Sequence, residues 1–368
     1  MKSNTDNFQA SFALKVLVGL AAAGVVLYFM SHWSSLINNL FLAYIVATVA
    51  TPLLAWLRNK GLPDWLSFLL TLLLVAIASL VIIAFVLFAA SRLSGTIPTY
   101  VTQLESLSTE LDAVLTAVGL SQENLNSLLD LINLRQVLNT LAAVLSAGAN
   151  VLSHAVVIIL FVIFMLVQVF TTPRLVEREI KAGNTVLQRI LRYNTDLRQY
   201  MLITAVIAVV TGAMDTGLFF ILGIPDPLVW GIVAAILSFV PTIGFWLAAV
   251  PPSLLAFLIH GPALALVTFV GILLINGLAD NVIKPRYIGG GLDMAPFVVI
   301  FSVIFWAMIL GPVGAILGVP MTMLIRSLFF EADESLAWVA RLTGSGSAAL
   351  DGTRAVADTG SGESAEIE

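Results

Sequence analysis

Cysteine is absent from the 368-residue sequence, and charged residues are scarce. Without cysteine the chain has no disulfide, no zinc–thiolate site and no cysteine nucleophile. Aspartate, glutamate, lysine and arginine make up 11% of the residues, whereas about 25% of a soluble domain is charged. So few charges cannot keep the surface of a soluble globule hydrated, and 59% of the residues are hydrophobic. The composition therefore excludes a soluble protein and predicts a polytopic protein embedded in a lipid bilayer.

Motifs of enzymes are missing as well. The His-Glu-x-x-His of intramembrane metalloproteases does not occur, and residues 290–293 have the wrong spacing for the Gly-x-Gly-Asp of aspartyl intramembrane proteases. The histidines His32, His154 and His260 are scattered, so we expect no metal site. No nucleotide-binding loop is present, so any pumping must use ion gradients or run downhill. We therefore expect no enzyme activity, no cofactor and no nucleic acid partner.

Several apolar runs are long enough to cross a bilayer, which takes about 20 residues. They lie near residues 12–31, 36–57, 64–92, 152–171, 199–223 and 262–283. The first run contains Ala21-Ala22-Ala23, which loosely resembles a signal-peptide processing site, but this site falls in the middle of the run rather than after it. We therefore expect a retained first transmembrane helix.

The loops between these runs alternate in charge. Two segments are basic: the loop with Arg58 and Lys60, and residues 172–198. In residues 93–148, by contrast, all charged side chains except Arg135 are acidic. Basic loops lie in the cytoplasm by the positive-inside rule. This rule predicts cytoplasmic N- and C-termini and places residues 93–148 outside.

One sequence pattern occurs twice in the C-terminal part of the chain. The first copy has Pro227, an apolar run, residues 240–244 (Val-Pro-Thr-Ile-Gly) and then Val250-Pro251. The second has Pro296, an apolar run, residues 311–314 (Gly-Pro-Val-Gly) and then Val319-Pro320. Proline ends or kinks a helix because it lacks an N–H and clashes with the preceding turn. Two broken apolar segments in corresponding places are typical of the binding site of a transporter.

The length of the first copy favours a re-entrant hairpin. Residues 228–258 would span about 46 Å as one helix, too long for one straight crossing and too short for two. We expect this copy to enter from outside and return outside. The next run, 262–283, would then cross inward and put Lys284 and Arg286 in the cytoplasm. The second copy, 296–330, would enter from inside, which also leaves Arg326 and Arg341 in the cytoplasm. Two oppositely oriented hairpins would form an inverted repeat whose tips meet at a polar site; the alternative is two kinked helices with no site.

The sequence therefore predicts an all-α, polytopic transmembrane protein with two re-entrant hairpins and an extracytoplasmic helical segment. Residues 1–92 hold transmembrane helices one to three, and 93–148 form the extracytoplasmic amphipathic segment, either a lid or subunit contact or a set of helices lying on the bilayer or the protein. Residues 149–198 hold the fourth transmembrane helix and a basic cytoplasmic helix. Residues 199–330 form a transport core, and 331–368 are an acidic, largely disordered tail.

The C-terminal motifs resemble the autoinducer-2 exporter family of bacterial transporters. The matching stretches are residues 223–225, 239–244, 250–251, 280–285, 311–314 and 319–320, and the Tyr44, Pro52, Leu57 and Gly61 spacing is similar too. The resemblance implies a multi-pass protein of the bacterial inner membrane and a homo-oligomer, often described as pentameric. It also implies an export role, assigned to autoinducer-2 in some members and to sodium–proton antiport in others.

Asp215 is the first candidate site residue, because ionisable groups inside a bilayer are costly and usually functional or paired. It is either a carboxylate that binds a cation or a proton, or a structural group bonded to a neighbouring helix. Asn276, Asp280 and Asn281 share one face of the 262–283 run, where they would contact a substrate or ion, unless Asn281 ties down the helix C-terminus. At the hairpin tips the candidates supply a hydroxyl or free backbone groups for a polar ligand: Pro241, Thr242, Gly244, Gly311, Pro312 and Gly314.

The leading hypothesis is a secondary transporter that exports a small solute across the bacterial inner membrane. An autoinducer-2-like signalling molecule or another small metabolite is the expected substrate. Antiport of sodium or lithium against protons is the alternative. A membrane scaffold or regulator that transports nothing is a third hypothesis, which a liposome flux assay would separate from the other two.

Overall fold

The computed structural model describes residues 3–118, 154–171, 173–284 and 294–330, and all regular elements in these ranges are helices. The all-helical fold class is therefore confirmed for the described residues. The helices are α1 Ser3–His32, α2 Ser34–Asn59, α3 Asp64–Val118, α6 Ala155–Thr171, α7 Pro173–Lys181, α8 Thr185–Ile221, α9 Pro227–Leu237, α10 Ile243–His260, α11 Pro262–Leu278, η1 Ala279–Ile283, α13 Pro296–Leu310, α14 Pro312–Ile325 and η3 Arg326–Phe330.

Five helical stretches are long and apolar enough to cross a membrane, and shorter apolar helices accompany them. The five are Ser34–Asn59, Asp64–Leu93, Thr185–Ile221, Ile243–His260 and Pro312–Phe330. Large apolar side chains cover their outer faces; Leu20 on α1 and Trp65 on α3, for example, are 66% and 67% exposed. Such a surface is stable only against lipid or protein, so the chain is a multi-pass membrane protein.

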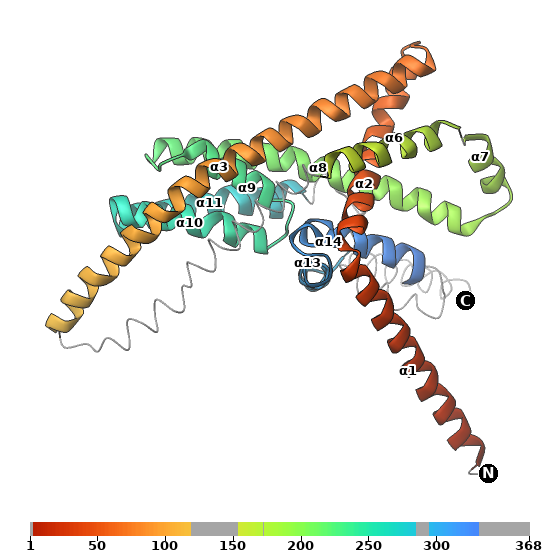
Figure 1. Ribbon diagram of the computed structural model, residues 1–368, viewed down its shortest axis with the longest axis horizontal. Coiled ribbons are helices and arrows are strands. Elements are labelled where there is room, and N and C mark those ends of the chain that lie inside the picture. The colour runs from red at the N-terminus through yellow and green to blue at the C-terminus, as the bar shows by residue number, and fades with distance from the viewer. Residues whose placement is uncertain (1–2, 119–153, 172, 285–293, 331–368) are drawn as a thin grey trace, which may run out of the picture.

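Helix α3 is longer than the sequence predicts. The third apolar run was expected to end near residue 92, with a separate amphipathic helix after it. Instead one helix of 55 residues continues from Asp64 to Val118 and reaches well beyond the other helices (Figure 1). Residues 119–148 of the expected extracytoplasmic segment and the acidic tail 331–368 lie outside the described residues.

The basic segment 172–198 is also divided differently from the expectation of one short helix. Gly183 ends α7 with a positive φ of 78°, and Asn184 starts α8 by accepting a hydrogen bond on Oδ1 from the backbone N–H of Leu187 at 3.1 Å. A side-chain oxygen at this position satisfies one of the free N–H groups of a helix N-terminus. The basic residues after 185 therefore belong to the first turns of α8, which runs on without a break into the apolar part.

Helix α8 joins two buried clusters of apolar side chains. The first-hairpin cluster is built around Trp230 of α9 and includes Phe219 near the end of α8. The second-hairpin cluster is built around Trp306 of α13 and includes Leu197 nearer the start of α8. In Figure 1, α8 runs across the middle of the molecule, and α9 and α11 pack along it. The middle of α8 therefore lies where the two clusters meet.

The first copy of the repeated pattern folds as a helical hairpin. Helix α9 ends at Leu237 and α10 begins at Ile243, so the break falls at the predicted place. A Cβ atom added to Gly223, just before α9, would lie 3.8 Å from Nε2 of His260, the last residue of α10. The segment between them therefore returns to the end from which it started.

The second copy is a tighter hairpin, because α13 and α14 are separated by Gly311 alone. Gly311 has a positive φ of 76°, which suits glycine. A Cβ on Gly314 would lie 2.1 Å from the carbonyl oxygen of Trp306, and one on Gly318 would lie 3.1 Å from that of Ser302. The two helices are thus antiparallel and in close contact. Figure 1 shows α13 almost end-on while α8 runs across the view, so the second hairpin is steeply inclined to α8.

Candidate functional site

Asp215 lies on the buried face of α8 with no exposed surface. Among the residues whose side chains the structure describes, it is the only buried aspartate, glutamate, lysine, arginine or histidine. Inserting an aspartate into the bilayer costs up to about 2.5–3.5 kcal/mol, the value at the centre of a transmembrane helix. A group this costly usually has a partner or a function, so Asp215 is the natural centre of a candidate site.

Asn276 of α11 is the hydrogen-bond partner of Asp215. Its Nδ2 donates to Oδ2 of Asp215 at 3.4 Å and to the carbonyl oxygen of Ile272, one turn earlier, at 3.1 Å. The second carboxylate oxygen of Asp215, Oδ1, is buried and has no hydrogen-bond partner in the described part of the chain. The structure thus brings together two of the predicted site residues and leaves one strong acceptor unused.

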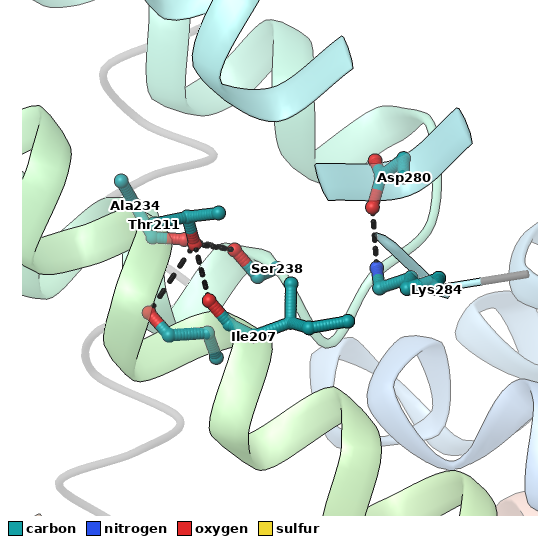
Figure 2. Close-up of polar contacts among 7 residues, drawn as sticks. Ile207, Thr211, Ala234, Ser238, Asp280 and Lys284 are labelled. Carbon is teal, nitrogen blue, oxygen red and sulfur yellow. Dashed lines mark hydrogen bonds and ion pairs between the residues drawn. The ribbon is translucent and has the colours of Figure 1, made fainter. Parts of the chain in front are cut away.

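One turn before Asp215 on α8, Thr211 faces the end of the first hairpin's leading helix. Its Oγ1 lies 3.4 Å from Oγ of Ser238, the residue that follows α9. Figure 2 shows the two hydroxyl groups pointing toward one another. Neither residue was a predicted site residue, because threonine and serine hydroxyls inside helices usually bond only to their own backbone.

Asp280 and Lys284 form an ion pair one turn beyond Asn276. Their Oδ1 and Nζ atoms lie 2.5 Å apart (Figure 2). Asp280 lies in the π-helical segment η1, which continues α11 with a wider turn. Single π-helical turns are frequent at functional sites. Asn281 also lies in η1, but its side chain is outside the described residues.

In this structure the predicted tip residues of the first hairpin form and pack the turn between α9 and α10. Thr242 has a positive φ of 64°, its side chain is exposed, and it makes no capping hydrogen bond to α10. Pro241 precedes it in the turn. A Cβ on Gly244 would lie 1.9 Å from the carbonyl oxygen of Leu237, so only glycine fits there. The hydroxyl of this hairpin that lies against Thr211 of α8 is that of Ser238.

The second tip is held from outside the hairpin. Asn38 of α2 donates a hydrogen bond from Nδ2 to the carbonyl oxygen of Leu310 at 3.0 Å, at the point where Gly311 ends α13. Pro312 begins α14 with an exposed side chain, and Gly314 packs on Trp306. Val240 of the first tip belongs to the same buried cluster as Leu310. The two tips therefore share an apolar cluster, with Asn38 as a polar side chain beside the second tip; its Oδ1 is buried without a hydrogen-bond partner among the described residues.

The arrangement can bind a small polar solute or a monovalent cation. It offers the free carboxylate oxygen of Asp215, the carboxamide of Asn276 and the hydroxyl groups of Thr211 and Ser238. No group of three or more potential metal ligands occurs among the described residues. Hydrogen bonding and charge are therefore the means of recognition that these side chains supply.

Comparison with known proteins agrees with this description. Residues 17–332 match the model of the "AI-2E family transporter" family. The "AI-2 transport protein TqsA" of Escherichia coli (strain K12) is 27% identical over 313 residues, which are 85% of this chain and 91% of that protein. The "Putative transport protein YrrI" of Bacillus subtilis (strain 168) is 25% identical over 332 residues, 80% of this chain and 85% of that protein. The chain therefore belongs to the AI-2E transporter family.

Proposed function

We propose that this protein is a secondary transporter that exports a small polar solute of the autoinducer-2 type across the bacterial inner membrane. The solute binds beside Asp215 and Asn276, between α8 and α11. Membership of a transporter family supports movement of a solute in general, and the name of the Escherichia coli relative supports this solute class.

A single observation carries the choice of site: the buried carboxylate of Asp215 has one oxygen paired with Asn276 and the other unpaired. Nearly all buried polar atoms in folded proteins have a partner. A solute hydroxyl or a cation would supply the missing one. Asp215 belongs to α8, which packs in both hairpin clusters. Ligand binding at its unpaired oxygen would therefore affect the packing of both hairpins.

Transport further requires that the site opens to each side in turn. We propose that the two hairpins enter the membrane from opposite sides, the first from outside and the second from the cytoplasm. The return of α10 to the start of α9 supports a re-entrant path for the first, and the close α13–α14 pair supports one for the second. The site would be exposed by movement of the first hairpin against the second, with α8 between them.

Flux into and out of liposomes tests the proposal directly. Purified protein would be reconstituted, and movement of autoinducer-2, sodium, lithium and protons followed in separate assays. We expect autoinducer-2 flux that depends on the protein, and its loss in the Asp215→Asn variant. The Asp64→Asn variant is the matched control, because Asp64 is 56% exposed and pairs with Arg58 on the surface.

The outcomes separate the hypotheses. Sodium or lithium exchange for protons without autoinducer-2 flux would replace export by antiport. No protein-dependent flux of any of the four would favour a scaffold or regulator. Autoinducer-2 flux that is equal in the parent and in Asp215→Asn would move the binding position away from Asp215.

A further inference from the structure

Buried polar side chains form a line along one face of α8. Thr204, Thr211 and Asp215 are 1%, 2% and 0% exposed. Helical residues advance by about 100° each, so the spacings of seven and four residues keep all three within about 20° of one direction. The contacts of Asp215 to Asn276 and of Thr211 to Ser238 are made from this face.

Two buried polar groups on this face of α8 flank Thr211. Oδ1 of Asp215 has no hydrogen-bond partner among the described residues, and Oγ1 of Thr204 lies beside the hydroxyl of the buried Tyr200, one turn earlier on α8. The Oγ1 of Thr211 donates to the carbonyl oxygen of Ile207 at 2.9 Å and lies against Ser238. Asp215 and Thr204 thus lie on either side of the Thr211–Ser238 contact.

We infer that the solute passes along this face of α8, and that the Thr211–Ser238 contact is the constriction between a binding position at Asp215 and a second one at Thr204. This inference rests on the proposed function and adds to it a second position and a gate. A threonine hydroxyl can both donate and accept a hydrogen bond, so the second position suits an uncharged solute that carries hydroxyl groups.

The contact is weak enough to open. Each hydroxyl has a carbonyl of its own helix as acceptor, Ile207 for Thr211 at 2.9 Å and Ala234 for Ser238 at 2.8 Å. The 3.4 Å separation between the two oxygens therefore adds little, and parting them leaves neither group without a partner. Opening the constriction would therefore carry no free-energy penalty for an unpaired hydroxyl.

The structure also shows which part can move. Two turns before Ser238, α9 is fixed against α8, because a Cβ on Gly231 would lie 1.8 Å from Oγ1 of Thr216 and 2.6 Å from the carbonyl oxygen of Gly212. After Ser238 the helix has ended and the chain turns through Thr242 with its positive φ. The end of α9 can therefore swing while its first turns stay in place.

Flux measurements on size variants at the constriction test this inference. In autoinducer-2-loaded liposomes, Ser238→Leu should lower flux more than tenfold, whereas Ser238→Ala should keep or raise it, because bulk rather than the hydroxyl closes the path. Thr204→Val should lower flux about fivefold, the effect of one lost hydrogen bond of about average strength. Thr195→Val is the control, since it makes the same change of side chain at an exposed position of α8, where Oγ1 bonds only to the carbonyl oxygen of Leu191 at 3.1 Å.

A thiol-labelling assay keeps the inference testable even without solute flux. The chain has no native cysteine, so Thr204→Cys provides the only thiol for a membrane-impermeant reagent. We expect this thiol to react in liposomes, and autoinducer-2 to slow the reaction; Ser238→Leu should block labelling from one side only. Folding of each variant would be checked by its thermal midpoint and gel-filtration profile.

Two results would overturn the path. One is a Thr204→Cys thiol that never reacts in the folded protein; the other is Thr204→Val and Ser238→Leu transporting as well as the parent. If instead the thiol reacts and Ser238→Leu blocks it, but autoinducer-2 neither moves nor protects, the path stands and the proposed solute is wrong.

Discussion

Nδ2 of Asn276 donates a hydrogen bond to Oδ2 of Asp215 across the interface of α8 and α11, although the two residues are 61 positions apart in the chain. The helices approach closely here, since a Cβ on Gly271 would lie 2.6 Å from a methyl group of Leu218. The carboxamide thus orients a carboxylate whose other oxygen has no hydrogen-bond partner among the described residues.

Asp215→Asn should abolish transport without weakening the fold. Hydrogen bonds to charged groups contribute about 1.5–3 kcal/mol, so flux should drop at least about tenfold. The thermal midpoint in detergent should stay equal or rise, because an amide of the same shape removes the cost of a buried charge. A lower midpoint with full flux would instead show that Asp215 is structural.

Gly231→Ala should destabilise the protein, whereas Gly217→Ala should not. A Cβ at Gly231 would overlap Thr216 and the backbone of Gly212, and overpacking costs about 1–3 kcal/mol. Nothing lies within 4 Å of a Cβ at Gly217, where alanine adds up to about 1 kcal/mol of helix propensity. Thermal midpoints of the two variants should therefore shift in opposite directions, and equal shifts would contradict the α8–α9 contact.

Tyr193→Phe should loosen the second hairpin from α8. The buried hydroxyl of Tyr193 donates to the carbonyl oxygen of Pro320 in α14 at 3.1 Å. Its removal deletes this hydrogen bond between α8 and the second hairpin, a bond worth about 0.5–1.5 kcal/mol. Tyr28→Phe is the control, because Tyr28 is 73% exposed on α1. Both thermal midpoints would be measured in the same detergent. Identical values for the two variants would show that the Tyr193 hydroxyl does not stabilise the contact with α14.

Asn184→Ala should fray the start of α8. The loss of its bond to Leu187 costs about 1 kcal/mol, as at other helix N-termini. Amide hydrogen exchange over the first turn should become faster, while exchange in the middle of α8 stays the same. Asn184→Ser keeps a capping oxygen and should restore slow exchange; a serine variant as fast as alanine would argue against the cap.

The positions of the helix breaks were predictable, because they depend on residues next to them in the chain. Pro241, Gly311 and Pro312 favour a break in a helix, and the structure breaks at both places. Proline alone does not decide, because α2, α10 and α14 continue through Pro52, Pro251 and Pro320. The early start of α8 was not predicted, since the change from polar to apolar residues near 199 suggested a boundary that no glycine or proline enforces. The length of α3 was missed because Gly95 and Pro98 follow the predicted end near residue 92, yet the helix continues through both.

The candidate site was predictable in part. Asp215 and Asn276 stand out as polar groups in apolar runs, but their contact depends on how α11 packs against α8. Ser238 and Thr204 carry no such signal, because burying a serine or threonine hydroxyl in an apolar helix costs little free energy when it bonds to its own backbone. Only the packing reveals that Ser238 faces Thr211 and that Thr204 is buried on the same face of α8.

The first hairpin starts and ends at one place, where Gly223 lies beside His260. Residues 224–259 can therefore be exchanged as one unit. The corresponding segment of another family member could replace them without changing the distance between the end of α8 and the start of α11. Chimaeras of this kind would place the donor's residue at position 238 against an unchanged Asp215–Asn276 pair, so the contribution of each part to transport could be measured separately.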